Sequence, residues 1–123
     1  MMRLLESGED YLETIYILSK RGNVRAIDIV NELNYSKPSV SIAMKKLKEN
    51  GYIEINNSNI TLTNLGYEIA HRIYERHEII SKALISLGVN KDVALLDACK
   101  IEHDLSEESF NAIKNHLEKK MEK

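Results

Sequence analysis

Apolar residues recur at helical spacing along most of the chain, and only one proline and five glycines interrupt it. Because glycine and proline are the strongest breakers of regular structure, this pattern predicts a mainly α-helical protein. Ser7 is expected to cap the first helix, and Gly88 to close the long fourth one. The helices are expected at about 7–20, 26–33, 36–50, 64–86, 91–103 and from 106 to near the C-terminus.

Between the third and fourth helices, apolar and polar residues alternate in two short runs, Tyr52 to Ile55 and Ile60 to Thr63. They flank Asn56 to Asn59, whose asparagines and serine favour a tight turn, so we expect a β-hairpin. Two helices, a turn and a hairpin are typical of a winged helix-turn-helix. The predicted fold is therefore an N-terminal winged helix-turn-helix domain, residues 1–63, followed by an all-helical lobe, residues 64–123.

Charge is unevenly distributed along the chain. The net charge of -2 indicates no general attraction to nucleic acid, yet the segment from Ser36 to Lys48 contains lysines and no acid. On a third helix these lysines and the hydroxyls face outward, where they can contact phosphates and approach the major-groove floor. The alternative is a face that serves only solubility, although such a face normally alternates charge signs. The expected DNA-contacting residues are Ser36, Lys37, Pro38, Ser39, Ser41, Lys45 and Lys46.

The densest candidate chemistry lies late in the chain. On a helix, Cys99 lies three and four residues before Glu102 and His103, so a thiolate, a carboxylate and an imidazole share one face. All three side chains bind divalent transition metals. Asp10 and Glu13, three residues apart on the first helix, offer a second half-site. Metal ligands on either side of a DNA-binding motif indicate a metal-sensing repressor.

The cysteine count and the hydropathy of the chain indicate the cellular compartment to expect. One cysteine cannot form an internal disulfide, so we expect a reduced thiol in a cytoplasmic protein. No apolar run approaches the roughly 18 residues needed to span a bilayer. The first residues lack the apolar stretch of a signal peptide. No association with a membrane is therefore expected.

Five separated segments form a recognisable set in the sequence. They are Glu9 to Tyr16, Ser36 to Ser41, Leu62 to Gly66, Arg76 to Glu78 and Cys99 to His103. In this order, and over nearly the whole chain, they resemble the diphtheria toxin repressor and manganese transport regulator family. The resemblance implies a homodimer whose metal-bound form binds double-stranded operator DNA and represses metal-uptake genes. It also implies the short manganese-type architecture, because the chain ends near Lys123 without room for an SH3-like domain.

The same resemblance implies a set of metal ligands. Asp10 and Glu13 match the manganese type, whereas Cys99 matches the iron type, since the manganese type has glutamate there. The histidine of the family's second site is matched by His77. The implied primary site is Asp10, Cys99, Glu102 and His103, with Glu13 and His77 forming a neighbouring site that can share Glu102.

This ligand set bears on the metal and on the switch. Carboxylates suit Mn(II), whereas a thiolate with an imidazole favours Fe(II), Co(II), Ni(II) or Zn(II). Cys99 therefore tilts the expected effector toward Fe(II), with Mn(II) close behind and Zn(II), Co(II) or Ni(II) able to bind in vitro. Without metal, the carboxylates of Asp10, Glu13 and Glu102 would repel one another. A divalent cation would remove that repulsion and tie the first helix to the fifth.

Other interpretations stay open at this point. Cys99 is also typical of a small packed core residue, and Asp10 of an acid that favours its helix dipole. A hydrolytic metalloenzyme is not expected, because no residue is left over as a general base. The remaining alternative is a winged-helix regulator that responds to thiol oxidation or to an organic ligand. For a dimer, the expected surface lies around Ile79, Ile80, Leu84, Leu87, Leu95 and Leu96.

Overall fold

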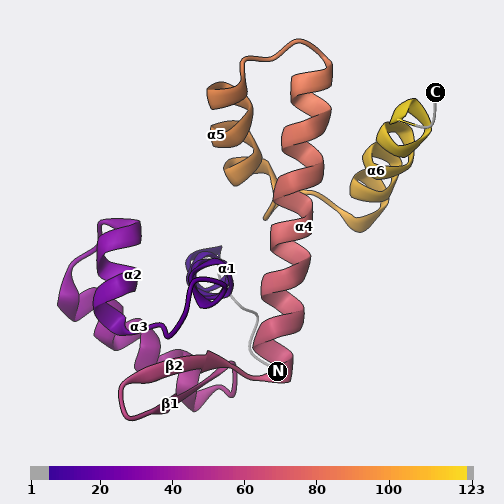
Figure 1. Ribbon diagram of the computed structural model, residues 1–123. Coiled ribbons are helices and arrows are strands. Elements are labelled where there is room, and N and C mark those ends of the chain that lie inside the picture. Colours follow the sequence, from indigo (N-terminus) through magenta and orange to yellow (C-terminus); the bar gives the residue numbers. More distant parts are fainter. Residues whose placement is uncertain (1–5, 122–123) are drawn as a thin grey trace. The chain divides into compact units, whose positions relative to one another are not determined.

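The computed structural model describes residues 6–121 and is mainly helical, with one small antiparallel sheet, which confirms the predicted fold class (Figure 1). The elements are α1 (Glu6–Ser19), α2 (Ala26–Leu33), α3 (Lys37–Glu49), β1 (Ile53–Asn56), β2 (Asn59–Leu62), α4 (Asn64–Ser86), α5 (Lys91–Ile101) and α6 (Glu107–Met121). They form two compact units, Met1–His71 and Arg72–Lys123. The predicted domain division after residue 63 falls at the start of α4, whereas the compact units divide further along that helix.

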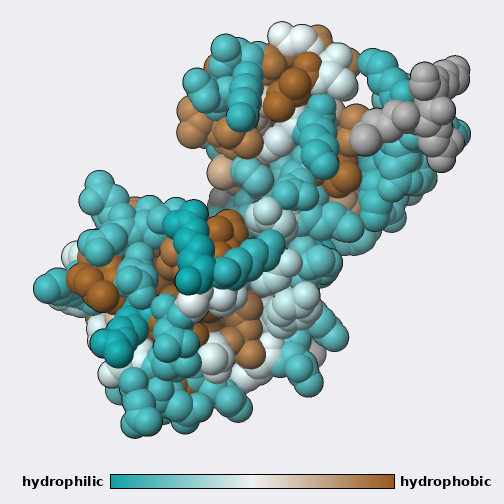
Figure 2. Space-filling view, in the orientation of Figure 1, coloured by the Kyte–Doolittle hydropathy of each residue, from teal (hydrophilic) through white to brown (hydrophobic). Residues whose placement is uncertain are grey.

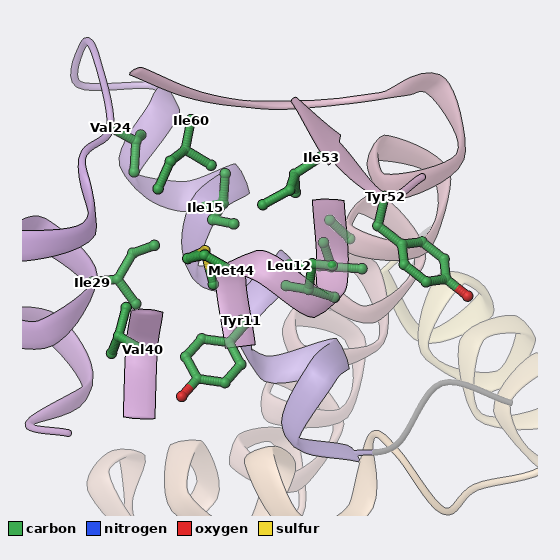
Figure 3. Close-up of a cluster of buried hydrophobic side chains, with 12 residues drawn as sticks. Tyr11, Leu12, Ile15, Val24, Ile29, Val40, Met44, Tyr52, Ile53 and Ile60 are labelled. Atoms are coloured by element: carbon green, nitrogen blue, oxygen red, sulfur yellow. The ribbon is translucent and has the colours of Figure 1, made fainter. Parts of the chain in front are cut away.

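The core of the first unit is one cluster of apolar side chains from the three helices, the hairpin and the start of α4 (Figure 3). Leu12 and Ile15 of α1 lie at its centre with Ile29 of α2, and none of the three is exposed. Burial of such side chains stabilises each by about 1.5 to 3 kcal/mol. This cluster is what holds α3 against the rest of the unit.

Local signals fix the two ends of α3. Asn34 ends α2 in the left-handed conformation, with φ 59°, and the chain then turns into α3. The Ser36 hydroxyl caps α3 by accepting a hydrogen bond of 3.2 Å from the Ser39 backbone N–H. Pro38 occupies the first turn, where a missing N–H costs nothing. Val40 and Met44 face the core as predicted, so the opposite face of α3 is turned to solvent.

The hairpin pairs β1 with β2 in the register Ile53 to Leu62 and Asn56 to Asn59. Asn57 and Ser58 form the turn with φ 50° and 68°, the left-handed pair typical of a two-residue hairpin turn. The hairpin predicted from the alternation is therefore confirmed, with a shorter turn than expected. The Ile60 backbone N–H also donates to the Val24 carbonyl at 2.8 Å, which ties the wing to the loop between α1 and α2.

Two predicted helix ends were wrong. Since the described part of α1 already begins at Glu6, Ser7 lies inside the helix and does not cap it. The fifth helix ends at Ile101, so Glu102 serves as its C-cap and His103 lies in the following turn. Beyond the end of the helix, the carbonyls of Glu102 and Leu105 accept hydrogen bonds from the Arg76 side chain. No glycine or proline announces this stop.

The second unit contains the latter part of α4 with α5 and α6, which Figure 1 shows on its two sides. Ala94 and Ala98 of α5 are fully buried. Ile80, Phe110 and Leu117 are buried except for a small fraction of their surface. In Figure 2, apolar side chains also reach the surface over α5 and the end of α4. Among residues 6–121, no helix is both long and apolar enough to cross a membrane.

Candidate metal centre and DNA-binding surface

Glu102 is the central residue of the candidate metal centre. Its side chain is fully buried, and its two carboxylate oxygens face two different imidazoles. Oε2 lies 3.0 Å from Nδ1 of His77, and Oε1 lies 3.4 Å from Nε2 of His103. A buried carboxylate is costly unless it is paired or bound to a metal. The second unit alone thus places one acid between two metal-binding side chains.

Cys99 joins the same cluster from α5. Its thiol is exposed, and Sγ lies 3.7 Å from Nδ1 of His77. One ligand atom each from His77, Cys99 and Glu102 lies within 4.8 Å of the others. A nitrogen from α4, a sulfur from α5 and an oxygen from the C-cap residue of α5 therefore lie close together. This donor set suits a borderline transition metal such as Fe(II), Co(II) or Zn(II).

Hydrogen bonds to Cys99 and to Glu102 raise the pKa of His77 from 6.5 to about 10, against the lowering effect of burial. The cluster therefore holds a proton on His77 at neutral pH. A metal ligand must be deprotonated, so this proton occupies the place that a cation would take.

A second observation shows that a cation fits here. Oε1 of Glu102 is buried. Although Nε2 of His103 lies 3.4 Å away, Oε1 makes no hydrogen bond with any described residue. Leaving a buried acceptor unsatisfied costs about 1 to 3 kcal/mol, and more for a charged group. A divalent cation bound by this oxygen would remove that cost. The residues present thus fit the chemistry of a metal site.

The six predicted metal ligands lie on both units. Asp10 and Glu13 are half-buried on α1 of the first unit, three residues apart and hence on one face. Within the second unit, Cys99 lies with His77 and Glu102, whereas His103 contacts Glu102. The sequence-based grouping had placed Cys99 with His103. In the structure, Cys99 lies in one group with His77 and Glu102, and α5 ends at Ile101, before His103. The metal-binding role of each residue stays a prediction.

The predicted DNA-contacting residues lie together on the exposed side of α3 and its cap. Those residues are Ser36, Lys37, Pro38, Ser39, Ser41, Lys45 and Lys46, all exposed. The hydroxyls of Ser36 and Ser39 hydrogen-bond each other at 2.8 Å, so they are already engaged at the cap. Ser41, Lys45 and Lys46 are then the stronger candidates for contacts to DNA.

Ile42 was not among the predicted DNA-contacting residues, yet its side chain is 58% exposed on α3. It lies three residues after Ser39 and three before Lys45, so it shares their outer face. Apart from Pro38, the predicted DNA-contacting residues were all lysines and serines. The available signal was its position, two residues from both Val40 and Met44 and therefore outside the buried stripe.

Comparison with known proteins places the chain in a family. The model of the iron dependent repressor N-terminal DNA binding domain matches residues 3–59, and that of the iron dependent repressor metal binding and dimerisation domain matches residues 63–122. An uncharacterised HTH-type transcriptional regulator of Methanocaldococcus jannaschii is 36% identical over 118 residues, covering 93% of this chain and 94% of that protein. The transcriptional regulator MntR of Escherichia coli O157:H7 is 35% identical over 113 residues, covering 90% and 73%.

Among solved structures, the manganese regulator SloR superposes with a TM-score of 0.80 at 28% identity. The match covers 90% of this chain and 53% of SloR, so the chain spans about half the length of that relative. The two matched domain models together cover nearly the whole chain. The chain thus belongs to the iron-dependent repressor family, whose members are metal-dependent, DNA-binding transcriptional regulators and not enzymes.

Proposed function

We propose that this protein is a homodimeric repressor that binds palindromic operator DNA when Mn(II) or Fe(II) occupies the cluster around Glu102. The observation that carries the proposal is the fully buried Glu102 carboxylate, which faces two imidazoles and keeps one oxygen without a hydrogen bond. The oxygen without a hydrogen bond is costly in the metal-free protein, and a bound cation would offset that cost. Because members of the family regulate transcription, metal binding at this site would control the binding of DNA.

The proposed ligands come from both units. In the second unit, His77, Cys99 and Glu102 form one three-donor group, and His103 approaches the other oxygen of Glu102. Asp10 and Glu13 of α1 would complete the coordination, as the family resemblance implies. This arrangement would make α1 part of the metal site. The position of the first unit would then depend on metal.

The switch rests on the charges of these side chains. The Asp10, Glu13 and Glu102 carboxylates would oppose one another if brought together, and each like-charged pair at ~4 Å costs about 1 to 4 kcal/mol. A bound divalent cation supplies the positive charge that offsets this cost. Asp10 and Glu13 would hold α1, and with it α3, in the DNA-binding position. A coupling of about 1 to 3 kcal/mol changes DNA affinity by roughly 5- to 150-fold.

The choice of metal is finely balanced. SloR is named as a manganese regulator, and carboxylates such as Asp10 and Glu13 suit Mn(II). Cys99 adds a soft sulfur donor that favours Fe(II). We therefore propose that both metals activate the protein, and that Cys99 increases the response to Fe(II) relative to a carboxylate at this position.

The dimer surface is proposed on the second unit. Leu87 at the end of α4 is 74% exposed and Leu96 on α5 is 66% exposed, and both belong to the predicted surface. Exposed leucines of this kind are removed from water when two copies pair. Two α3 helices related by a two-fold axis would then bind two operator half-sites about 34 Å apart.

One experiment tests the proposal as a whole. A random DNA duplex library is incubated anaerobically with the protein, in parallel samples holding Mn(II), Fe(II) or a chelator, and bound duplexes are sequenced. The expected result is an enriched palindrome with either metal and none with the chelator. Equal enrichment in all three samples would contradict metal control.

Thiol oxidation is a second candidate signal, because the exposed Cys99 thiol lies beside an imidazole. It is tested on the selected palindrome by adding peroxide to the chelated protein and, separately, to the Cys99→Ser variant. A response of DNA binding to peroxide without metal, absent from the variant, would favour the oxidation switch over the metal switch.

A further inference from the structure

Arg76 is a buried charge that the proposed metal site does not use directly. It lies on α4, one residue before His77, and its side chain is only 7% exposed. Its Nη1 donates to the Glu102 carbonyl at 3.1 Å and to the Leu105 carbonyl at 2.5 Å. Both acceptors lie in the connection from α5 to α6. Arg76 therefore holds the chain at the point where the fifth helix stops.

The same guanidinium also holds the start of α6. Its Nη2 lies 2.7 Å from Oε1 of Glu107, and its carbon lies 5.3 Å from the ring centre of Phe110. Glu107 belongs to the first turn of α6 and is 65% exposed at its side chain. One side chain thus joins α4, the end of α5 and the first turn of α6.

Glu102 is consequently held at both of its ends by neighbouring residues of α4. Arg76 binds its backbone carbonyl, while His77 binds Oε2 of its carboxylate. With the backbone and one oxygen fixed, the remaining oxygen, Oε1, has its direction determined, and this is the buried oxygen without a hydrogen-bond partner. A carboxylate fixed in this way loses little freedom when it binds a cation.

We propose that Arg76 is a positioning residue for the metal centre and that its ion pair with Glu107 couples the docking of α6 to metal affinity. The inference rests on the proposed function, since it concerns the same site. A buried arginine is costly unless its hydrogen bonds are made, yet its Nε has no partner among the described residues. Stability alone is thus a poor reason for a charge here, whereas fixing the Glu102 backbone is a specific one.

The test compares two neighbouring acids of α6. Glu107 and Glu108 both lie in the first turn and both favour the helix dipole, but Glu107 is the one that contacts Arg76. Mn(II) affinity of the full chain is measured by competition with a fluorescent chelator for Glu107→Ala, Glu108→Ala and Arg76→Lys. Thermal unfolding of the metal-free variants is measured in parallel.

We expect Glu107→Ala and Arg76→Lys to weaken Mn(II) binding about tenfold, a typical loss when a partner that orients a ligand is removed. Glu108→Ala should bind Mn(II) as the unchanged protein does. Equal affinities in Glu107→Ala and Glu108→Ala would overturn the proposal, because helix stability would then explain any loss.

A spectroscopic readout separates positioning from general stability. At saturating Co(II), the absorption bands of the bound ion should shift in Arg76→Lys and in Glu107→Ala, since the Glu102 oxygen is displaced. They should stay in place in Glu75→Gln, which weakens the other α4 to α6 ion pair, Lys114 Nζ to Glu75 Oε2 at 3.3 Å. Unshifted bands in all three variants would overturn the positioning role while leaving the metal site intact. If the unchanged protein binds neither Mn(II) nor Co(II), the proposed function itself fails, and this role with it.

Discussion

At the scale of single residues, the proposed metal chemistry depends on where each side chain lies relative to Glu102. His77 and Cys99 are its neighbours on one side, and His103 lies at its other oxygen. The sequence identified each of these residues as a candidate ligand. Their grouping depended on the end of α5, which no residue in the sequence marks.

The first prediction concerns the sulfur donor. Replacing Cys99 with Ser should weaken Fe(II), Co(II) and Zn(II) binding strongly and Mn(II) binding less, because a soft donor is removed while oxygen and nitrogen donors remain. The Co(II) complex should also lose its near-ultraviolet thiolate charge-transfer band. Titrations of both proteins with each metal measure the change. An unaltered Co(II) spectrum in Cys99→Ser would show that the sulfur does not bind the metal.

The second prediction concerns Ile42, the exposed apolar residue of α3. An apolar side chain in the major groove contacts the methyl group of thymine, which deoxyuridine lacks. Replacing the relevant thymine by deoxyuridine in a selected operator should weaken binding roughly fourfold, given about 0.8 kcal/mol for a buried methylene-sized group. The same replacement should have little effect on Ile42→Ala, as measured by fluorescence anisotropy.

The control for this experiment is Ile27→Ala, which removes another exposed isoleucine of the first unit, on α2. It should keep the full sensitivity to deoxyuridine. If Ile42→Ala and the unchanged protein respond alike at every thymine, the side chain of Ile42 does not read the methyl group.

At the scale of elements, α3 is the best-determined part of the molecule. Ser36 caps it, Pro38 starts it, and Val40, Met44 and Leu47 bury one face. These local signals agree with one another, which is why the sequence predicted both the helix and its exposed residues. Helix α3 is therefore held in place by its buried face, and Lys45 and Lys46 are exposed and do not pack in the core.

The third prediction follows from that exposed face. Replacing Lys45 and Lys46 with Ala should weaken DNA binding and reduce its salt dependence, by about one unit of slope for each phosphate that is no longer neutralised. Mn(II) affinity should stay unchanged. Mobility shifts across a range of salt concentrations provide the measurement. The matched control is Lys91→Ala, an exposed lysine at the start of α5, and an equal reduction of slope there would indicate a nonspecific charge effect.

At the scale of the whole molecule, the proposed function requires two copies of the chain. The second unit exposes leucines at the end of α4 and on α5, and one of the two matched family models describes a dimerisation domain. A palindromic operator needs two α3 helices related by a two-fold axis. We therefore expect DNA binding and dimerisation to fail together.

The fourth prediction tests this link. Replacing Leu96, which is 66% exposed, with Glu should convert a dimer to a monomer, because a carboxylate would have to be buried at the proposed interface. Sedimentation velocity measures the change, and DNA binding should fall with it. Leu65→Glu adds the same charge at an exposed position of the first unit, where it should leave the dimer intact. A dimer that survives Leu96→Glu would place the interface elsewhere.

The sequence by itself determined the elements and the candidate chemistry. Apolar spacing, the helix cap Ser36 and the left-handed turn residues Asn57 and Ser58 are local signals. They act over short distances, so they can be read along the chain. The winged helix-turn-helix followed from such signals. Helical spacing also pointed to the candidate ligands on the first and fifth helices, whereas His77 was implied by the family resemblance. Here local sequence and final structure agree because the same residues both form the elements and bury their faces.

Only the tertiary structure decided where α5 stops and which candidate ligands meet. Arg76, on α4, donates hydrogen bonds to carbonyls just beyond α5 that lie 26 and 29 residues away, and no local pattern can encode such hydrogen bonds. The helix ends before His103, and Cys99 lies beside His77, which comes from α4. The spacing from Val40 and Met44 already placed Ile42 outside the buried stripe, and the structure adds that its side chain is 58% exposed.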